Sequence, residues 1–205
     1  MRRTEHAARR DRIPVRFAFW FDPRGDTAAD CRQNDPMSGW TTLEDDRIGL
    51  LSDTHAVVDR TELALERLLE AGATTILHLG DLGSEQIMDR LAGLPVRLVF
   101  GNVDEERAFS RYARRLDLVV DHPTMRLSIG GRRIIATHGH LESELVQAVE
   151  ERPDFIIHGH SHVIRDETLD GIRFLNPGAV HRAAVWSVAT LDPATGRFSI
   201  IELPR

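Results

Sequence analysis

Five of the ten histidines in the chain lie between positions 138 and 162, in two short motifs that each follow a hydrophobic run. The motifs are Thr137-His138-Gly139-His140 and His158-Gly159-His160-Ser161-His162. Imidazole is a common protein ligand for borderline transition metals, so two such motifs at the ends of predicted strands suggest a metal centre. A single histidine at a strand end is more often an ordinary polar residue. The choice between these interpretations depends on whether oxygen ligands occupy equivalent positions elsewhere in the chain.

Oxygen-bearing side chains follow the three earlier hydrophobic runs. The residues after these runs are Asp53 with His55, Asp81, and Asn102. Taken singly, each oxygen-bearing residue has a structural explanation as a turn former or a helix cap. Buried aspartates and histidines without partners would be costly, whereas divalent cations would neutralise them. The complete set therefore indicates a metal or catalytic site.

The predicted elements bring these positions together. From Arg47 onward, strands are predicted at 48–52, 75–79 and 96–100, and helices at 59–72, 84–91 and 105–116. Such alternation predicts a mostly parallel sheet covered by helices, with ligands bound where the carboxyl ends of the strands gather. Residues two apart in extended backbone point to the same side. We therefore expect Asp53 with His55, and His160 with His162, to present two ligands each.

The second half of the chain predicts a hairpin, one helix and further strands. Gly130-Gly131 joins strands at 125–129 and 132–137, a helix follows at 141–149, and residues 155–157 form another apolar strand. The runs at 163–168, 172–175, 183–191 and 197–203 predict antiparallel strands. The expected fold class is α/β, a four-layer α/β/β/α sandwich of two mixed sheets flanked by helices.

The ordered set of motifs resembles the calcineurin-like metallophosphoesterase superfamily and, within it, the small YfcE-type phosphodiesterases. The motifs are Asp53-Thr54-His55, Gly80-Asp81, Gly101-Asn102-Val103-Asp104, Thr137-His138-Gly139-His140 and Gly159-His160-Ser161-His162. The resemblance runs from about Arg47 to the C-terminus, includes Asn176-Pro177-Gly178, and leaves the first 46 residues uncovered.

The resemblance implies two divalent metal ions and seven ligand positions, all of which are filled. Asp53, His55 and His162 would hold one ion, Asn102, His138 and His160 would hold the other, and Asp81 would bridge them. Mixed nitrogen and oxygen ligands suit manganese, with nickel, iron or zinc as alternatives, better than a dedicated magnesium or calcium site. A metal-bound hydroxide would then hydrolyse a phosphodiester in a small substrate without a protein nucleophile.

One position departs from the pattern of many superfamily members. Those members carry a histidine at this position that is thought to protonate the leaving group, whereas this chain has Val103. The YfcE-type branch also lacks this histidine. His140 is our first candidate for a catalytic proton donor or a phosphate contact, and a purely structural histidine is the alternative. We expect Asp104 to be the N-cap of the following helix. His78 and His158 are expected to support the site or the core through hydrogen bonds, and Arg182 could contact phosphate.

A rival interpretation is an interaction scaffold. The retromer subunit Vps29 resembles this fold while acting chiefly as an interaction module, so the fold alone does not establish catalysis. Retention of all seven ligand positions favours an enzyme, because a scaffold has no need for costly buried ligands.

Composition excludes several other functions. The formal charge is −6 with acidic and basic residues interspersed, which argues against long nucleic acid as a partner. No apolar run approaches the roughly 20 residues that span a bilayer, so we expect no membrane segment. All 26 basic residues are arginines, which excludes a Schiff-base lysine and the lysine of a phosphate-binding loop. Cys31 is the only cysteine, which excludes an intramolecular disulfide and fits a cytoplasmic location.

The chain is predicted to contain one metallophosphoesterase domain, residues 47–205. Residues 1–46 show no sustained period of 2 or 3.6, and we interpret them as a poorly ordered N-terminal extension. An alternative is that the protein starts at Met37. The oligomeric state is left open, with a homodimer or a larger assembly among the alternatives.

Overall fold

Two six-stranded mixed sheets stack face to face in the computed structural model, which describes residues 39–44 and 47–205. The first, called the β2 sheet, carries the strands that precede Asp53, Asp81 and Asn102. In spatial order it contains β12 (Arg197–Glu202), β11 (Ser187–Asp192), β2 (Ile48–Leu51), β3 (Thr75–His78), β4 (Val96–Leu98) and β5 (Val119–Val120). Strands β2 to β5 are parallel, while β11 is antiparallel to both β2 and β12.

The second sheet, called the β7 sheet, carries the strands that precede the two histidine motifs. In spatial order it contains β1 (Thr41–Leu43), β6 (Thr124–Ile129), β7 (Arg132–Thr137), β8 (Phe155–His158), β10 (Ile172–Asn176) and β9 (Arg165–Leu169). Strands β7, β8 and β10 are parallel to one another, and β1 is parallel to β6. The β6–β7 and β9–β10 pairs are antiparallel.

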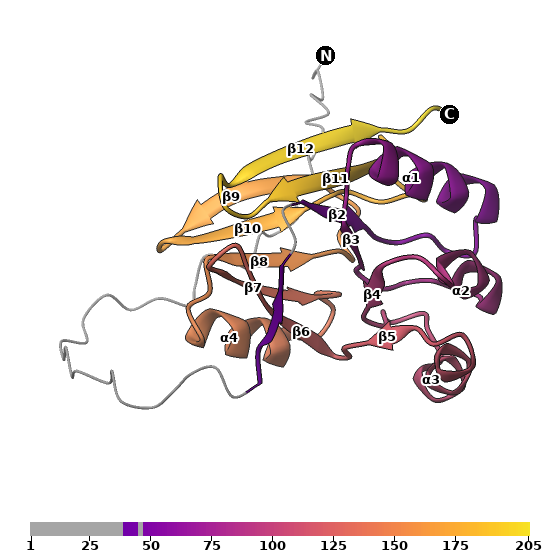
Figure 1. Cartoon of the computed structure of the whole chain (residues 1–205), viewed down its shortest axis with the longest axis horizontal. Coiled ribbons are helices and arrows are strands. Elements are labelled where there is room, and N and C mark those ends of the chain that lie inside the picture. The colour runs from indigo at the N-terminus through magenta and orange to yellow at the C-terminus, as the bar shows by residue number, and fades with distance from the viewer. Residues whose placement is uncertain (1–38, 45–46) are drawn as a thin grey trace, which may run out of the picture. The chain divides into compact units, whose positions relative to one another are not determined.

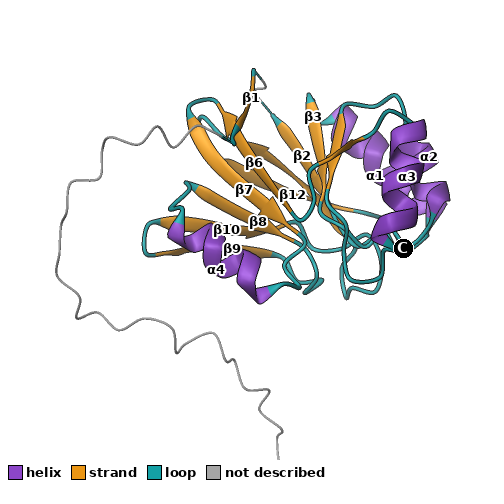
Figure 2. Ribbon diagram, turned by 90° about the horizontal axis from the view of Figure 1, so that it is seen from below, coloured by secondary structure: helices purple, strands orange, loops and turns teal. Residues whose placement is uncertain are grey.

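Helices cover the outer face of each sheet, which gives four layers (Figures 1 and 2). Helices α1 (Val58–Glu70), α2 (Glu85–Leu91) and α3 (Glu106–Arg115) lie on the β2 sheet, and α4 (Glu142–Glu150) lies on the β7 sheet. The predicted α/β sandwich of two mixed sheets with flanking helices is confirmed.

Alternating side chains explain why the central strands are apolar throughout. In β2, Leu50 faces the core between the sheets, while Leu51 packs toward the helices on the other side. In β8, Ile157 faces the same inter-sheet core, whereas Ile156 packs toward α4. A strand that is covered on both faces has no solvent side to reserve for polar residues. The hydrophobic runs of the sequence therefore mark buried central strands.

Strand pairing differs from the sequence prediction at three places. Thr41–Leu43 pairs with β6, so the expectation of little stable structure before residue 47 does not hold for this segment. The rest of the predicted extension, residues 1–38 and 45–46, lies outside the described residues. The two-residue strand β5 was not predicted, and β10 pairs in parallel with β8 on one side. Short edge strands and pairing direction depend on neighbours that are distant in sequence, so local patterning does not reveal them.

None of the helices formed by the described residues is long and apolar enough to cross a membrane.

The inter-sheet core makes a direct prediction for Leu127 of β6, which is fully buried there. Leu127→Ala should lower the free energy of unfolding by about 2–5 kcal/mol, because a leucine cavity between two rigid sheets cannot collapse. Leu169→Ala is the control, since Leu169 is 43% exposed, and it should change stability by about 0.5 kcal/mol at most. Urea denaturation of both variants measures the difference. Equal effects would contradict the assignment of Leu127 to the core.

Candidate metal centre

The carboxyl ends of β2, β3 and β8 meet through hydrogen bonds that backbone N–H groups donate. The Asp53 N–H donates to the carbonyl of Gly80 at 3.0 Å, which joins the loop after β2 to the loop after β3. The His160 N–H donates to Asp53 Oδ2 at 3.2 Å, which joins the two sheets. Residues from distant parts of the chain therefore converge at one edge of the sandwich, as the strand order predicts.

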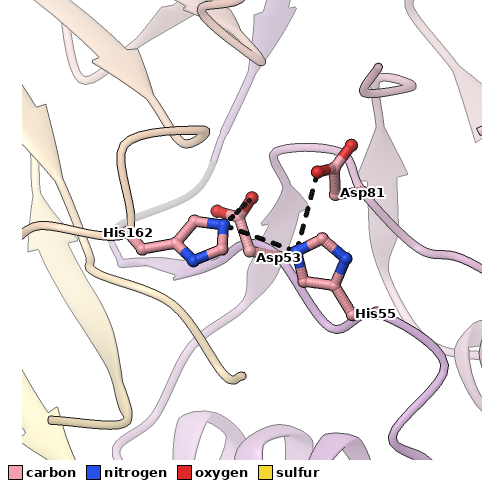
Figure 3. Close-up of side chains that lie close together, drawn as sticks. All are labelled: Asp53, His55, Asp81 and His162. Carbon is pink, nitrogen blue, oxygen red and sulfur yellow. Dashed lines mark hydrogen bonds and ion pairs between the residues drawn. The ribbon is translucent and has the colours of Figure 1, made fainter. Parts of the chain in front are cut away.

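Four side chains form a first group with ligand atoms within 4.8 Å of one another: Asp53, His55, Asp81 and His162. His162 Nε2 lies 3.2 Å from Asp53 Oδ1 and 3.4 Å from His55 Nε2. His55 Nε2 lies 3.7 Å from Asp81 Oδ2. In Figure 3, dashed lines join one nitrogen of the His55 ring to the Asp81 carboxylate and to the His162 ring.

The hydrogen bonds of His162 show why this group favours a cation. Its Nδ1 lies 3.1 Å from the carbonyl oxygen of Arg182, and a carbonyl can only accept, so Nδ1 carries the ring proton. In the neutral ring, the Nε2 lone pair then faces Asp53 Oδ1. That oxygen is buried and has no hydrogen-bond partner among the described residues. Lone pairs that face one another repel, and a shared divalent ion removes the repulsion.

A second group surrounds His138 on the other side of Asp81. The Nδ1 of His138 lies 2.7 Å from the carbonyl oxygen of Leu79, so it too carries the ring proton. Its Nε2 lies 3.3 Å from Asp81 Oδ1 and 3.2 Å from Asn102 Oδ1. Burial lowers the pKa of His138 to about 4, which leaves the ring neutral and its Nε2 lone pair free. Asp81 therefore directs one carboxylate oxygen toward each group.

His160 and His140 lie beside the second group without entering the first. The ring centroids of both lie 5.1 Å from that of His138, and their own centroids are 6.2 Å apart. His160 is exposed, whereas His140 is half-buried and its Nδ1 has no partner among the described residues. Burial is the main cause that lowers the pKa of His140. The structure thus brings all seven predicted ligand residues and His140 to one edge of the sandwich, where the ring of His160 lies next to those of His138 and His140.

The backbone at these positions corrects the sequence-based geometry. Extended backbone was expected, but five of the seven residues are left-handed: Asp53 (φ 58°), His55 (46°), Asp81 (56°), His160 (64°) and His162 (57°). A non-glycine residue in this region costs about 1–2 kcal/mol, and such residues cluster at functional sites. The expected pairing of Asp53 with His55 occurs, although by a different backbone conformation. The expected pairing of His160 with His162 does not, since only His162 joins the first group.

Two glycines allow the close approach of the loops. A Cβ at Gly101 would overlap the carboxylate of Asp81. A Cβ at Gly159 would overlap Ser52 Oγ and lie 3.1 Å from Asp53 Oδ2. The glycines of these two motifs are therefore required by the space beside the aspartates, and neither depends on an unusual φ.

Asp104 has a different role from the predicted helix cap. Its carboxylate accepts hydrogen bonds from the backbone N–H groups of Leu82 at 3.1 Å, Gly83 at 2.9 Å and Gly101 at 2.8 Å. Glu105 caps α3 instead, through an oxygen that accepts from the N–H of Ala108. Burial raises the pKa of Asp104, and the three N–H groups oppose that rise. Asp104 therefore ties the loop of Asp81 to the loop of Asn102.

His78 supports the same loops from inside the core. The Gly80 N–H donates to His78 Nδ1 at 3.2 Å, so Nε2 carries the ring proton and donates to Thr54 Oγ1, also at 3.2 Å. Burial lowers the pKa of His78 to about 3, consistent with a permanently neutral ring. This agrees with its predicted supporting role.

Asn176 and His158 support the histidine loop after β8. The Asn176 amide donates to the carbonyl of Gly159 at 2.9 Å and to Ser161 Oγ at 3.1 Å. The Nδ1 atom of His158 lies 3.1 Å from the same Gly159 oxygen, which fits its predicted hydrogen-bonding role. Asn176, the first residue of the Asn-Pro-Gly turn, therefore holds the backbone between His158 and His162 in place.

Sequence reasoning did not identify His181 as a neighbour of the site. Its backbone N–H donates to the carbonyl of Asp53 at 3.1 Å, and its ring centroid lies 6.2 Å from that of His55. Burial, followed by the charge of Arg60, lowers the pKa of His181. Arg182, predicted as a phosphate contact, is exposed and lies close enough to assist burial in lowering the pKa of His55. The sequence signals for this segment were the Asn176-Pro177-Gly178 motif, which ends three residues before His181, and Arg182, and neither pointed to His181.

Comparison with known proteins places this geometry among characterised folds. Residues 47–196 match the calcineurin-like phosphoesterase superfamily domain. The probable metallophosphoesterase YsnB of Bacillus subtilis is 31% identical over 163 residues, which cover 73% of this chain and 88% of YsnB. Phosphodiesterase MJ0936 of Methanocaldococcus jannaschii is 27% identical over 139 residues, which cover 64% of this chain and 82% of MJ0936. A solved structure described as a novel archaeal phosphodiesterase superposes with a TM-score of 0.69 at 25% identity, covering 77% of this chain and 99% of its own.

The buried carboxylate of Asp53 predicts a pH dependence of the metal-free protein. Burial raises its pKa from 3.8 to about 6, so the native state holds this proton more tightly than the unfolded chain between those pH values. The contribution of Asp53 to stability is then present below pH 4 and is lost as pH rises through 6, by up to about 3 kcal/mol. Asp53→Asn lacks this titration. After metal removal, the variant should therefore gain stability relative to wild type as pH rises from 4 to 7.

Urea denaturation in the presence of a chelator at several pH values measures this difference. Saturating manganese should reverse the order, because the wild-type carboxylate binds the cation more strongly than an amide does. A stability difference that does not change with pH would contradict the prediction.

Proposed function

Because the chain belongs to the calcineurin-like phosphoesterase superfamily, we propose that it is a phosphodiesterase whose centre holds two divalent metal ions. The observation that carries the proposal is the position of Asp81. Its Oδ2 faces His55 of the first group at 3.7 Å, and its Oδ1 faces His138 of the second at 3.3 Å. A carboxylate with one oxygen toward each group of candidate ligands is suited to bridge two cations.

The first group already offers donor atoms close enough for one ion, since its four ligand atoms lie within 4.8 Å of one another. In the proposed arrangement Asp53, His55 and His162 hold one ion, Asn102, His138 and His160 hold the other, and Asp81 contacts both. Neutral imidazoles and carboxylates match borderline metals, so manganese is our first choice, with nickel, iron or zinc as alternatives. Two such ions, when bound, supply Lewis acidity at the phosphoryl oxygens and lower the pKa of water at the site.

The residues of the chain then have distinct tasks. Hydrogen bonds to Leu79 and Arg182 fix the ring protons of His138 and His162, so that each Nε2 lone pair points to a ligand position. Asp104 fixes the spacing between Asp81 and Asn102. His140 supplies a polar atom next to the second group, and we assign it to the leaving oxygen or to the phosphate. Val103 cannot do so, because its side chain is apolar and its N–H already donates to Asp81 Oδ1 at 3.1 Å.

The proposed substrate is a small phosphoester. Relatives described as phosphodiesterases support the diester class. A formal charge of −6 disfavours long nucleic acid, whose binding depends on basic surface. A single cysteine, Cys31, supports a reducing and therefore cytoplasmic setting. The alternative of a scaffold resembling Vps29 is compatible with the fold, and catalysis is the property that separates the two.

Removal of Asp81 tests the enzyme proposal. Metal-stripped protein resupplied with manganese, nickel, zinc or magnesium should hydrolyse bis-p-nitrophenyl phosphate, and p-nitrophenyl phosphate more slowly. Asp81→Ala should lower kcat more than about 100-fold, because it removes a ligand from both groups. Asp89→Ala is the matched control, since Asp89 is exposed on α2, and its kcat should equal that of wild type. Absence of metal-dependent turnover in wild type would support the scaffold.

Metal content tests the division into two groups. Wild-type protein should bind two manganese ions per chain, measured by calorimetry and by elemental analysis after dialysis. His162→Ala should weaken the binding of one ion, and Asn102→Ala should weaken the binding of the other. Asp81→Ala should lower the affinity for both ions by about 10- to 100-fold or more. Asp89→Ala should retain two. A single ion in wild type, or the loss of the same ion from both single-group variants, would contradict the dinuclear arrangement.

A further inference from the structure

The segment that follows the Asn-Pro-Gly turn is bound edge to edge against the end of β2. The Val180 N–H donates to the carbonyl of Ser52, and the His181 N–H donates to that of Asp53, both at 3.1 Å. One residue later, the carbonyl of Arg182 accepts from the ring of His162 at 3.1 Å. His181 is therefore fixed to the backbone of one residue of the first group, and its neighbour to the side chain of another.

The ring of His181 lies next to the first group without being part of it. Its centroid is 6.2 Å from that of His55, with the ring planes at 65°. The four side chains whose ligand atoms gather within 4.8 Å do not include it, in the part of the chain that the structure describes. The residue is half-buried, so part of its surface is exposed to solvent. His181 is thus a non-ligand histidine on the His55 side, as His140 is on the His138 side.

Arg60 holds this ring in one tautomer. Its NH1 group lies 3.0 Å from His181 Nδ1 and 3.0 Å from the carbonyl oxygen of Val180. A guanidinium can only donate, so Nδ1 must accept and the ring proton must lie on Nε2. The guanidinium carbon lies 3.2 Å from the ring centroid of Trp186, which limits its freedom to turn away.

Trp186 is itself anchored from two directions. Its carbonyl accepts from the N–H of Leu203 at 2.8 Å, and its backbone forms a β-bridge with Ala179. Arg60 of α1, the loop carbonyl of Val180 and Trp186, the residue before β11, therefore combine to fix the ring proton of His181. Core packing alone does not need such an arrangement, whereas a hydrogen-bond donor at a polar site does.

We propose that His181 contacts the substrate, with its Nε2–H donating a hydrogen bond to an oxygen of the bound phosphoester. Arg60 is the positioning residue that keeps the proton on this nitrogen. The proposal rests on the proposed function of the site. It assigns one non-ligand histidine to each side of the phosphate, His181 beside the first group and His140 beside the second. No bond forms or breaks at His181, which stabilises negative charge on the oxygen as a neutral donor.

The first test compares His181→Ala with His181→Gln in the manganese-loaded protein. With bis-p-nitrophenyl phosphate, His181→Ala should lower kcat/KM about 10- to 100-fold, less than for an enclosed donor because water can replace the lost N–H. His181→Gln keeps an N–H near the same place and should recover most of the loss. Inorganic phosphate should inhibit His181→Ala more weakly than wild type. Metal content and thermal midpoint should be the same in all three proteins.

The second test concerns Arg60. Arg60→Ala should lower kcat/KM by less than His181→Ala, and should add almost nothing in the His181→Ala background, because both changes remove the same contact. Arg67→Ala is the matched control on the same helix, where the side chain forms only an exposed pair with Glu70, and should match wild type. Long-range proton–nitrogen correlation spectra should show the Nε2–H tautomer of His181 in wild type and a mixture in Arg60→Ala.

Three results would overturn the proposal. The first is a His181→Ala variant whose kcat/KM and inhibition by phosphate equal those of wild type. The second is a loss of metal or of folding in His181→Ala that accounts for its lower kcat/KM. The third is the same tautomer of His181 in Arg60→Ala as in wild type. If wild type shows no turnover with any metal, the proposed function fails by itself. Phosphate binding to the manganese-loaded protein, measured by calorimetry, then decides whether His181 contacts the anion.

Discussion

The site depends on a concentration of hydrogen-bond acceptors that cannot satisfy one another. Two carboxylates and the Nε2 lone pairs of two imidazoles, those of His138 and His162, meet where the sheets join, and the buried Asp53 Oδ1 has no hydrogen-bond partner among the described residues. Backbone carbonyls take the ring protons of His138 and His162, which leaves lone pairs on the inner sides. Such a set is costly for the folded protein unless a cation is shared among its members.

The surrounding structure compensates for this cost through backbone contacts. Left-handed residues aim the ligands inward, and hydrogen bonds between neighbouring loops hold them in that conformation. Asp104 accepts two of these bonds, from the N–H groups of Leu82 and Gly83, and so links the loops after β3 and β4. The rigid sandwich, with its apolar inter-sheet core, provides the foundation, since His162 and Asp53 come from loops of different sheets. Stability of the core and geometry of the site are therefore coupled.

Much of the fold followed from local patterns in the sequence. Apolar runs of four or five residues marked the central strands, because both faces of each are covered, and helical periodicity marked α1 to α4. The order of the polar motifs at the strand ends identified the ligand residues. Strands β1 and β5 were missed because each is only two or three residues long and is defined by its pairing partner.

The sequence by itself determined which side chains carry the chemistry, since residue type and order along the strands are local properties. Only the tertiary structure decided how they are used. It turned Asp104 from a helix cap into a clamp on two loops, separated His160 from His162, and brought His181 beside both His55 and Arg60. Each of these outcomes depends on contacts between segments far apart in the chain. The physical reason is that hydrogen-bond partners and left-handed backbone are selected by packing, which no short stretch of sequence contains.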